Sequence, residues 1–385
     1  MHSKESLREL FHSYFGEAGE EWFFSPGRVN VIGEHIDYNG GFVMPIAINY
    51  GVSALVKRNS GNVIRIYAQD FREELLIQRF DEIPISTPGS WKSYVTGMLK
   101  IMQRKGIVLD GLDMLMVSDL PIGAGLSSSA ALECLIGYVF AEDYYDEDRT
   151  ELAKDAQQAE HEFAGVMCGI MDQFAVACGK ADYAMLLDCQ SITCQYIPFD
   201  LGNNRLMVIN SNKPRALADS KYNERLAECK KALELLNFFN SENNLVDVSS
   251  LSLAYLEDDI LYARAKHVIS ENNRVKLACN ALLDGNIEAL GQLMLQSHES
   301  LDEDYEVAGY ELNTLIQYAM MVKECIGARM TGAGFGGCCI AIVERGAEEK
   351  FSRYLRKKYK EKTGLNCDVF AVEICDGVRK IQDEY

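Results

Sequence analysis

The chain has 385 residues, which is enough for two or three domains at about 100 to 200 residues each. Apolar residues make up 48% and charged residues 25%, as in folded globular proteins and unlike disordered or fibrous chains. The net charge of −19 gives no basic surface for nucleic acid or anionic lipid. An anionic ligand would therefore need a local device such as a glycine-rich loop, a helix N-terminus or a metal ion.

The first fifteen residues mix both charge signs with apolar positions and predict a short amphipathic helix, not a signal peptide. The chain holds no run close to the roughly 18 apolar residues that indicate a membrane span. We therefore expect a cytoplasmic protein without membrane contact. Its 12 cysteines are scattered and form no CxxC pair, so we interpret them as reduced core residues.

The two halves of the chain differ in composition. All 7 prolines lie at or before Pro214. Before that point, short β-branched or alternating runs predict strands, at 43–56, 62–69 and 112–118. After it, apolar residues recur every three or four positions, which predicts helices at about 219–239, 264–283, 287–298 and 306–325. Nearer the end we expect two strands, 338–343 and 367–372, on either side of a helix at about 347–362.

The most informative segment covers residues 112–140 and contains LPIGAGLSSSAAL. It predicts a strand, a glycine-rich turn and a helix whose free N–H groups and dipole favour an anion such as phosphate. It is not a P-loop, because GxxxxGK[ST] is absent, and it lacks the third glycine of a dinucleotide fingerprint. From this loop alone, a tight strand-to-helix turn with a serine cap is an equal alternative.

Two further segments are ambiguous by themselves. MTGAGFGGC, at 330–338, matches GxGxxG, but its glycines precede a strand, so the context of a dinucleotide-binding fold is missing. Taken alone, the motif favours a packed glycine turn. Residues 25–48 place several polar side chains between apolar strands, as a surface loop or a sugar site would.

Together these segments resemble the GHMP small-molecule kinases, and within them the galactokinase family. GRVNVIGEHIDYN, at 27–39, resembles the galactokinase signature, LPIGAGLSSSAAL resembles the ATP-phosphate motif, and MTGAGFGGC resembles the third family motif. Their order and spacing also fit, and the resemblance covers essentially the whole chain. One departure is Ile36, where the family usually has Thr, so a shifted sugar preference stays open.

The resemblance implies a two-domain α+β fold. Its N-terminal domain would resemble domain 2 of ribosomal protein S5, and its C-terminal domain would be ferredoxin-like with added helices. The active site would lie between them. We predict domains at 1–195 and 196–385, the first with the sugar signature and phosphate loop, the second with the third glycine-rich motif.

The resemblance also implies a reaction, in which the γ-phosphoryl group of ATP passes to the anomeric hydroxyl of D-galactose. Asp172, in CGIMDQF, would be the catalytic carboxylate, and Arg28 would lie beside it and keep it ionised. The residues expected to hold the sugar are Glu34, His35, Asp37, Gly169, Asp172 and Tyr222. The residues expected to hold ATP are Ile122, Gly123, Ala124, Gly125, Leu126, Ser127 and Ser128.

Mg²⁺ is the implied cofactor, since it prefers a few protein oxygens together with water and phosphate. Ser128 and Glu160 match the metal positions of the family. Two alternatives to a galactokinase stay open, a kinase for N-acetylgalactosamine or arabinose and a galactose sensor without catalysis. For Tyr222 the alternative is core packing, because it lies on the apolar face of its helix. The resemblance makes a monomer the expected state.

Overall fold

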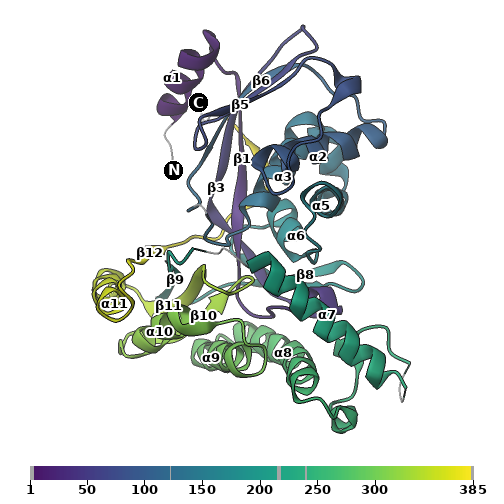
Figure 1. Ribbon diagram of the computed structural model, residues 1–385. Helices are drawn as coiled ribbons and strands as arrows, with labels where there is room; N and C mark the ends of the chain where they lie inside the picture. The colour runs from purple at the N-terminus through teal and green to yellow at the C-terminus, as the bar shows by residue number, and fades with distance from the viewer. Residues whose placement is uncertain (1–3, 122, 215–217, 239–240, 383–385) are drawn as a thin grey trace.

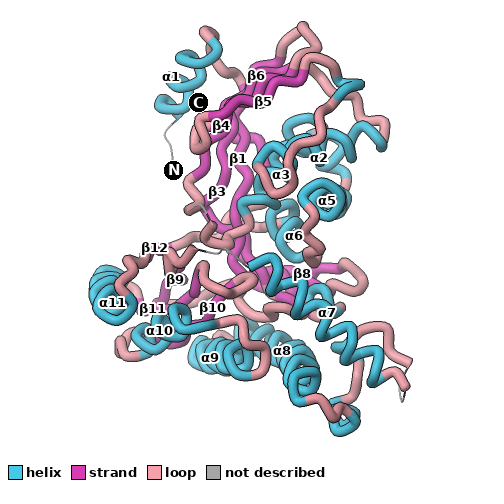
Figure 2. Tube along the Cα trace, in the orientation of Figure 1, coloured by secondary structure: helices cyan, strands magenta, loops and turns pink. Residues whose placement is uncertain are grey.

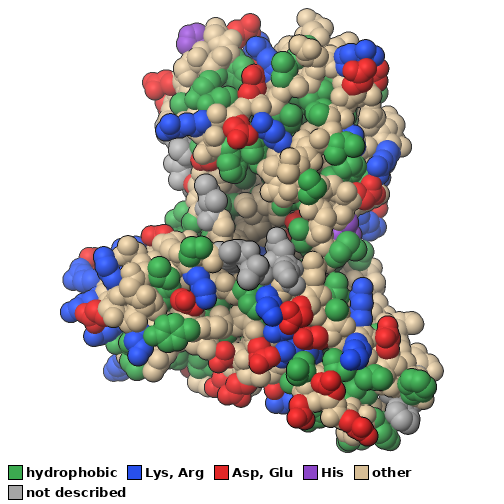
Figure 3. All heavy atoms as spheres, in the orientation of Figure 1, with side chains coloured by type: hydrophobic (Ala, Val, Ile, Leu, Met, Phe, Trp, Pro, Cys, Tyr) green, Lys and Arg blue, Asp and Glu red, His purple; other side chains and the backbone are tan. Residues whose placement is uncertain are grey.

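The computed structural model describes residues 4–382, apart from 122, 215–217 and 239–240. These residues form two lobes, and the face shown in Figure 3 narrows between them, with acidic and basic side chains intermixed over much of it. The upper lobe in Figure 1 contains both ends of the described chain.

A six-stranded sheet forms the centre of this upper lobe. Its strands in spatial order are β13 (Arg379–Ile381), β1 (Glu21–Asn30), β3 (Pro45–Arg58), β6 (Leu112–Ser118), β4 (Ile64–Ala68) and β5 (Glu73–Ile77). Neighbouring strands run antiparallel, except that β4 and β6 are parallel.

Helices cover both faces of this sheet (Figures 1 and 2). Those on the right in Figure 1 are α2 (Trp91–Arg104), α3 (Ser128–Phe140), α5 (Arg149–Ala159) and α6 (Met171–Cys178), while α4 (Glu142–Glu147) follows α3 in the chain. On the other face, Leu7 and Phe11 of α1 (Lys4–Phe15) pack against Leu55, Leu115 and Val117. Burial on both sides explains why β3 and β6 are nearly continuous apolar runs.

A small sheet, β2 (Phe42–Val43), β7 (Tyr183–Asp188) and β8 (Thr193–Pro198), continues from this lobe toward the second one. The second lobe contains an antiparallel sheet in the order β10 (Cys325–Thr331), β11 (Cys338–Glu344), β9 (Asn204–Asn210) and β12 (Asp368–Ala371). Numbered along the chain and read from the other edge, that order is 4-1-3-2, the order of a ferredoxin-like sheet.

Helices make up the rest of the second lobe. They are α7 (Ala218–Leu236), α8 (Asp259–Leu283), α9 (Ile287–Glu303) and α10 (Gly309–Met320) between β9 and β10, and α11 (Glu348–Thr363) between β11 and β12. The two-domain α+β prediction is confirmed. The boundary at residue 195 stays a prediction, and the last strand returns to the first lobe, where Trp22 of β1 pairs with Ile381 of β13.

Most predicted elements are found near their expected positions, and 112–118 is found as predicted. The helix predicted for 306–325 is wrong at its end, because α10 stops at Met320 and Cys325 begins strand β10. The sequence of this strand gives a weak signal, because it has Gly327 and Ala328 where β-branched residues would indicate a strand. Gly327 lies against the backbone of Gly291, which leaves no room for a side chain there. Strands β5, β7, β8, β9 and β13 were not predicted.

Within the part of the chain that the structure describes, none of the helices is both long and apolar enough to cross a membrane. All 12 cysteines are free, as the scattered spacing predicted. Most are buried, Cys338 and Cys339 completely.

Candidate active site

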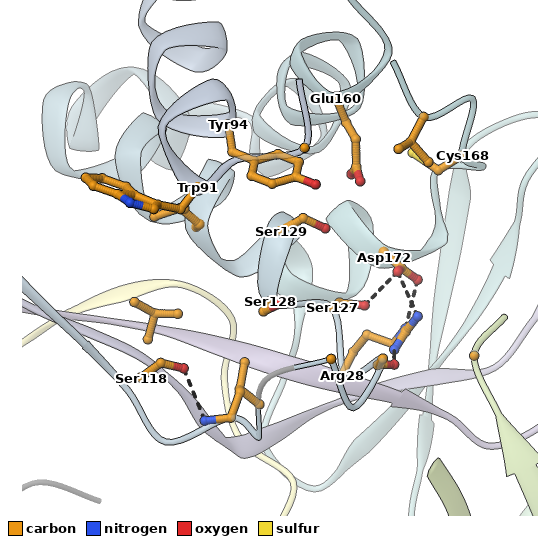
Figure 4. A pocket seen from close by; sticks show the side chains of 18 of the residues that line it. Arg28, Trp91, Tyr94, Ser118, Ser127, Ser128, Ser129, Glu160, Cys168 and Asp172 are labelled. Carbon is orange, nitrogen blue, oxygen red and sulfur yellow. Dashed lines mark hydrogen bonds and ion pairs between the residues drawn. The ribbon is translucent and has the colours of Figure 1, made fainter. Parts of the chain in front are cut away.

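A cavity of about 710 Å³ lies where the three sequence motifs meet. Residues of the first lobe line most of it, and Tyr222, Gly332 and Ala333 of the second lobe close one side. Its size is that of a pocket for a small molecule. Figure 4 shows the end at which Asp172, Arg28 and the start of α3 come together.

Asp172 is held by three hydrogen bonds at this end. Nε and Nη2 of Arg28 donate to its two carboxylate oxygens at 2.8 and 2.7 Å, and Ser127 Oγ donates at 2.6 Å. Arg28 is nearly buried, and its Nη1 also donates to the carbonyl of Gly125 at 2.8 Å. The aspartate is therefore fixed in position and paired with a positive charge, while 28% of its side chain remains exposed to the cavity.

The glycine-rich loop takes the shape expected of an anion site. Gly123, Gly125 and Ser127 all have left-handed backbone conformations, with φ between 61° and 75°. Ser127 precedes α3 but does not cap it, because its hydroxyl points to Asp172. The first N–H groups of α3 thus remain available at the cavity, which favours an anion there over the serine-cap alternative.

The third motif packs against this loop. A Cβ atom built on Gly332 would lie 3.1 Å from the carbonyl oxygen of Gly125 and 3.8 Å from Nη2 of Arg28. Motif residues more than 200 positions apart in the sequence thus meet around one guanidinium group. Of the other predicted ATP residues, Ala124 and Leu126 are buried, Ser128 is exposed, and Ile122 lies outside the described residues.

Glu160 begins the short π-helix η3 (Glu160–Ala164) and lines the cavity near α3. Burial, and then the charge of Asp172, raise its pKa to about 7, although hydrogen bonds from Ser129, Cys168 and Gln173 oppose the shift. Figure 4 shows Ser129 on the Glu160 side of the helix and Ser127 on the Asp172 side. Ser129 was not among the predicted site residues.

The donor set at Glu160 fits a hard cation. The hydroxyl of Ser128 and the carboxylate of Glu160 both line the cavity and are the kind of oxygen ligand that Mg²⁺ takes, and the cavity leaves room for water and phosphate. The raised pKa of Glu160 also reflects a buried negative charge that a cation would offset. Behind it, Glu133 is fully buried, and burial, followed by the charge of Glu160, raises its pKa well above the usual range.

Other residues of the first motif line the cavity near Asp172. Both carboxylate oxygens of Glu34 are bonded within the protein: Asn30 Nδ2 donates to Oε2 at 2.7 Å, and the backbone N–H of Gly332 donates to Oε1 at 2.8 Å. Arg329, which is completely buried, pairs with the same carboxylate at 2.5 Å. Glu34 thus borders the cavity and also joins the two lobes. Ile36 is fully buried and does not line the cavity.

Asp37 lies directly against Gly169. A Cβ atom on Gly169 would lie 1.9 Å from Oδ2 of Asp37, so only glycine fits beside this carboxylate. Burial, and then the charge of Asp172, raise the pKa of Asp37 to about 7. Asp37 and Gly169, both among the residues expected to hold the sugar, are therefore neighbours.

His35 and Tyr222 border the same end of the cavity, and their rings lie 5.6 Å apart. Both ring nitrogens of His35 are bonded within the protein, Nδ1 to the hydroxyl of Tyr38 and Nε2 to the carbonyl of Ala333. Burial, and then the charge of His267, lower the pKa of His35 to about 3, so the ring is neutral at physiological pH. Tyr222 comes from α7 of the second lobe.

An aromatic end of the cavity was missed in the sequence. Trp91 and Tyr94 of α2 line it together with Phe71, and the rings of Phe71 and Trp91 are stacked at 6.3 Å with an interplanar angle of 12°. Figure 4 shows Trp91 and Tyr94 on the α2 side, beyond the serines of α3. In the sequence these residues look like ordinary apolar positions of an amphipathic helix, and nothing there signals a pocket.

Comparison with known proteins decides the family. Residues 9–58 match the galactokinase galactose-binding signature, residues 93–180 match the N-terminal domain of GHMP kinases, and residues 278–361 match their C-terminal domain. A galactokinase from Exiguobacterium sibiricum is 42% identical over 385 residues, covering 99% of both chains. The chain belongs to the galactokinase family of GHMP kinases.

Other relatives agree with this membership. A galactokinase from Fusobacterium nucleatum is 42% identical and covers 98% of this chain and 100% of its own. The crystal structure of Lactococcus lactis galactokinase complexed with galactose superposes with a TM-score of 0.93, at 37% identity, over 98% of this chain and 99% of that one. Mevalonate kinase from Methanococcus jannaschii, at 20% identity and a TM-score of 0.64, shares the fold. The family resemblance stated from the three motifs is thus confirmed.

Proposed function

We propose that this galactokinase-family chain transfers the γ-phosphoryl group of ATP to the anomeric hydroxyl of D-galactose, giving α-D-galactose 1-phosphate. The observation that carries the proposal is the placement of Asp172. Its carboxylate is fixed by Arg28 and Ser127 at the point where the anion-binding loop and the polar residues of the first motif face one cavity.

In this reaction Asp172 orients the anomeric hydroxyl and accepts its proton as the oxygen bonds to the γ-phosphorus. The bond between the γ-phosphorus and its bridging oxygen breaks, and ADP leaves. Because phosphoryl transfer has a loose transition state, positioning and charge contribute more than strong base catalysis. Arg28 suits both tasks, since it grips the carboxylate and the carbonyl of Gly125 with one rigid guanidinium.

The sugar is expected at the end of the cavity formed by Glu34, His35, Asp37, Gly169 and Tyr222. Asp37 is our candidate for recognising the axial 4-hydroxyl, because a buried hydrogen-bonding group discriminates strongly against a substrate that cannot satisfy it. Since the ring nitrogens of His35 are engaged elsewhere, its contribution is to shape the wall and hold its neighbours.

The nucleotide would extend from the glycine loop toward the aromatic end. The loop and the first turn of α3 offer backbone N–H groups to the β- and γ-phosphates. Trp91 and Tyr94 offer an apolar wall for the adenine ring. Ser128 and Glu160 would hold Mg²⁺, which when bound offsets the charge of the phosphates.

Purified protein should be assayed for ADP release with ATP and Mg²⁺ in the presence of galactose, N-acetylgalactosamine, arabinose, glucose or no sugar. Asp172→Asn is the decisive variant, because it keeps the shape of the side chain and removes the charge. We expect turnover on galactose, lost in the variant, with galactose binding largely retained.

Other results would point elsewhere. Turnover on another sugar would overturn the substrate, and galactose binding without turnover would indicate a sensor. Near-normal turnover of Asp172→Asn would refute the role of this residue. A monomeric state and a cytoplasmic location remain predictions, which sedimentation and cell fractionation would test.

A further inference from the structure

A chain of hydrogen bonds runs behind the sugar end of the cavity and crosses between the lobes. Cys229 Sγ lies 3.0 Å from the hydroxyl of Tyr305, which lies 3.0 Å from the hydroxyl of Tyr38. That hydroxyl lies 2.8 Å from Nδ1 of His35, and Nε2 of His35 lies 3.1 Å from the carbonyl oxygen of Ala333. Cys229, Tyr305 and His35 are buried, and Tyr38 is partly buried.

The carbonyl at one end sets the direction of every bond in this chain. A carbonyl oxygen only accepts, so Nε2 of His35 carries the hydrogen. Because the imidazole is neutral, its Nδ1 is an acceptor and Tyr38 must donate to it. The oxygen of Tyr38 then accepts from Tyr305, which accepts in turn from the thiol of Cys229. Burial raises the pKa of that thiol to about 11, so its proton is present.

The chain joins the three segments that surround the sugar end. His35 lies between Glu34 and Asp37 in the first motif, with a left-handed backbone at φ 62°. Ala333 follows Gly332 in the third motif. Cys229 follows Tyr222 by two turns of α7 and therefore lies on the same face of that helix.

Aromatic contacts strengthen the same junction. The ring of Tyr222 lies 5.2 Å from that of Tyr38, and the ring of Tyr305 lies 5.0 Å from that of His35. A change in the chain therefore acts on both the first motif and α7, although the hydroxyl of Tyr305 does not line the cavity.

We propose that Tyr38 and Tyr305 are positioning residues for the sugar, whose hydroxyl groups hold the first motif, the third motif and α7 in register through one directional hydrogen-bond chain. This inference rests on the proposed function. Removing either hydroxyl leaves buried groups without a partner and loosens the wall around the sugar. The net contribution of such a bond corresponds to about a three- to tenfold loss of galactose affinity.

The test compares Tyr305→Phe, Tyr38→Phe and the double variant with Tyr359→Phe. Tyr359 is a matched control, because it is a buried tyrosine of the second lobe whose hydroxyl donates to the carbonyl of Ser211 at 2.9 Å, outside the chain. Galactose affinity is measured by calorimetry without ATP, together with KM for ATP and the melting temperature. Long-range ¹H–¹⁵N spectra report the His35 tautomer, with its signals assigned by their loss in His35→Gln.

We expect both single variants to weaken galactose binding about three- to tenfold while KM for ATP stays within about twofold. The double variant should bind galactose at most about twofold more weakly than whichever single variant binds it less tightly, because both changes break the same hydrogen-bond chain. Tyr359→Phe should lower the melting temperature without changing galactose affinity. His35 should show the Nε2–H tautomer, with its Nδ1 signal shifted in Tyr38→Phe.

Unchanged galactose affinity in Tyr38→Phe and Tyr305→Phe would overturn the proposal, and so would fully additive effects in the double variant. An Nδ1–H tautomer in the wild type would show that the chain does not run as inferred. If the wild type fails to bind galactose at all, the proposed function fails, while the tautomer measurement still decides whether the chain exists.

Discussion

Replacing Gly169 by Ala tests how closely Asp37 must be held. The added Cβ would lie 1.9 Å from Oδ2 and 2.3 Å from Cγ of Asp37, so the carboxylate must move by about 1.5 Å to restore an ordinary contact of 3.4 Å. The backbone of Gly169 is not in the left-handed region, so alanine adds no strain of its own. The terminal atoms of Asp37 can rotate, which protects stability but displaces the group expected to recognise the sugar.

A misplacement of about 1 Å in an active site costs about 100-fold in rate, or about 2.7 kcal/mol of transition-state stabilisation. We therefore expect kcat/KM for galactose to fall about 100-fold or more in Gly169→Ala. KM for ATP should change little, because the phosphate loop and the aromatic end of the cavity are untouched. The melting temperature should also stay close to that of the wild type.

The assay is steady-state ADP release at varied galactose and saturating ATP. Gly61→Ala is the matched control, since its Cβ would meet nothing closer than Asn59 Oδ1 at 3.5 Å and its φ is not positive. If Gly169→Ala keeps kcat/KM within about threefold of the wild type, the position of Asp37 does not control sugar recognition. Equal losses in both variants would mean that the effect is not local.

Three further outcomes follow from the same contacts. Arg28→Lys should lower kcat about 100-fold and change galactose affinity by only a few-fold, because lysine cannot keep both bonds to Asp172 and the bond to Gly125. Stopped-flow turnover and calorimetry would check this, and an unchanged kcat would contradict it. Burial raises the pKa of Glu133, so its ionisation opposes folding as the pH rises above 4.5, the pKa of this side chain in the unfolded chain. Glu133→Gln should therefore raise the melting temperature more at pH 8 than at pH 5, and an equal change at the two pH values would count against this reasoning. With the pKa of Asp37 near 7, galactose affinity should increase from pH 6 to pH 8 in calorimetric titrations, and Asp37→Asn should bind more weakly without that dependence.

Local patterns were enough to predict the parts of the site that come from one segment. The turn that joins strand and helix at 120–132 could be predicted from its own sequence, because glycines in left-handed conformations and the start of a helix depend on neighbouring residues. Strand 112–118 was predicted for the same reason, since apolar residues occupy most of this short segment and a turn follows it. Asp172 and Arg28, by contrast, became a pair only through family resemblance, as 144 positions separate them.

Long-range packing explains the failures. Strand β10 was missed because Gly327 packs directly against the backbone of Gly291, which lies 36 positions earlier in the chain. This contact requires a glycine, and the local sequence pattern around Gly327 gives no sign of it. Strand β13 has only three residues and owes its existence to pairing with β1 at the far end of the chain. The aromatic end of the cavity depends on how the start of α2 lies against the turn between β4 and β5, where Phe71 stacks on Trp91, so Trp91 and Tyr94 look like core residues until the fold is known.

The tyrosine chain shows why a polar residue near a binding motif is difficult to interpret from sequence. His35 lies beside Asp37 and was predicted to hold the sugar, yet Tyr38 and Ala333 occupy its two ring nitrogens. Tyr305, which donates to the hydroxyl of Tyr38 in this chain, lies 267 positions further along, just beyond α9. A neutral histidine locked in one tautomer contributes shape where a free one would contribute a hydrogen bond. We therefore expect sugar recognition in this pocket to depend on the closeness of α7 to the first motif as well as on the side chains that line the cavity.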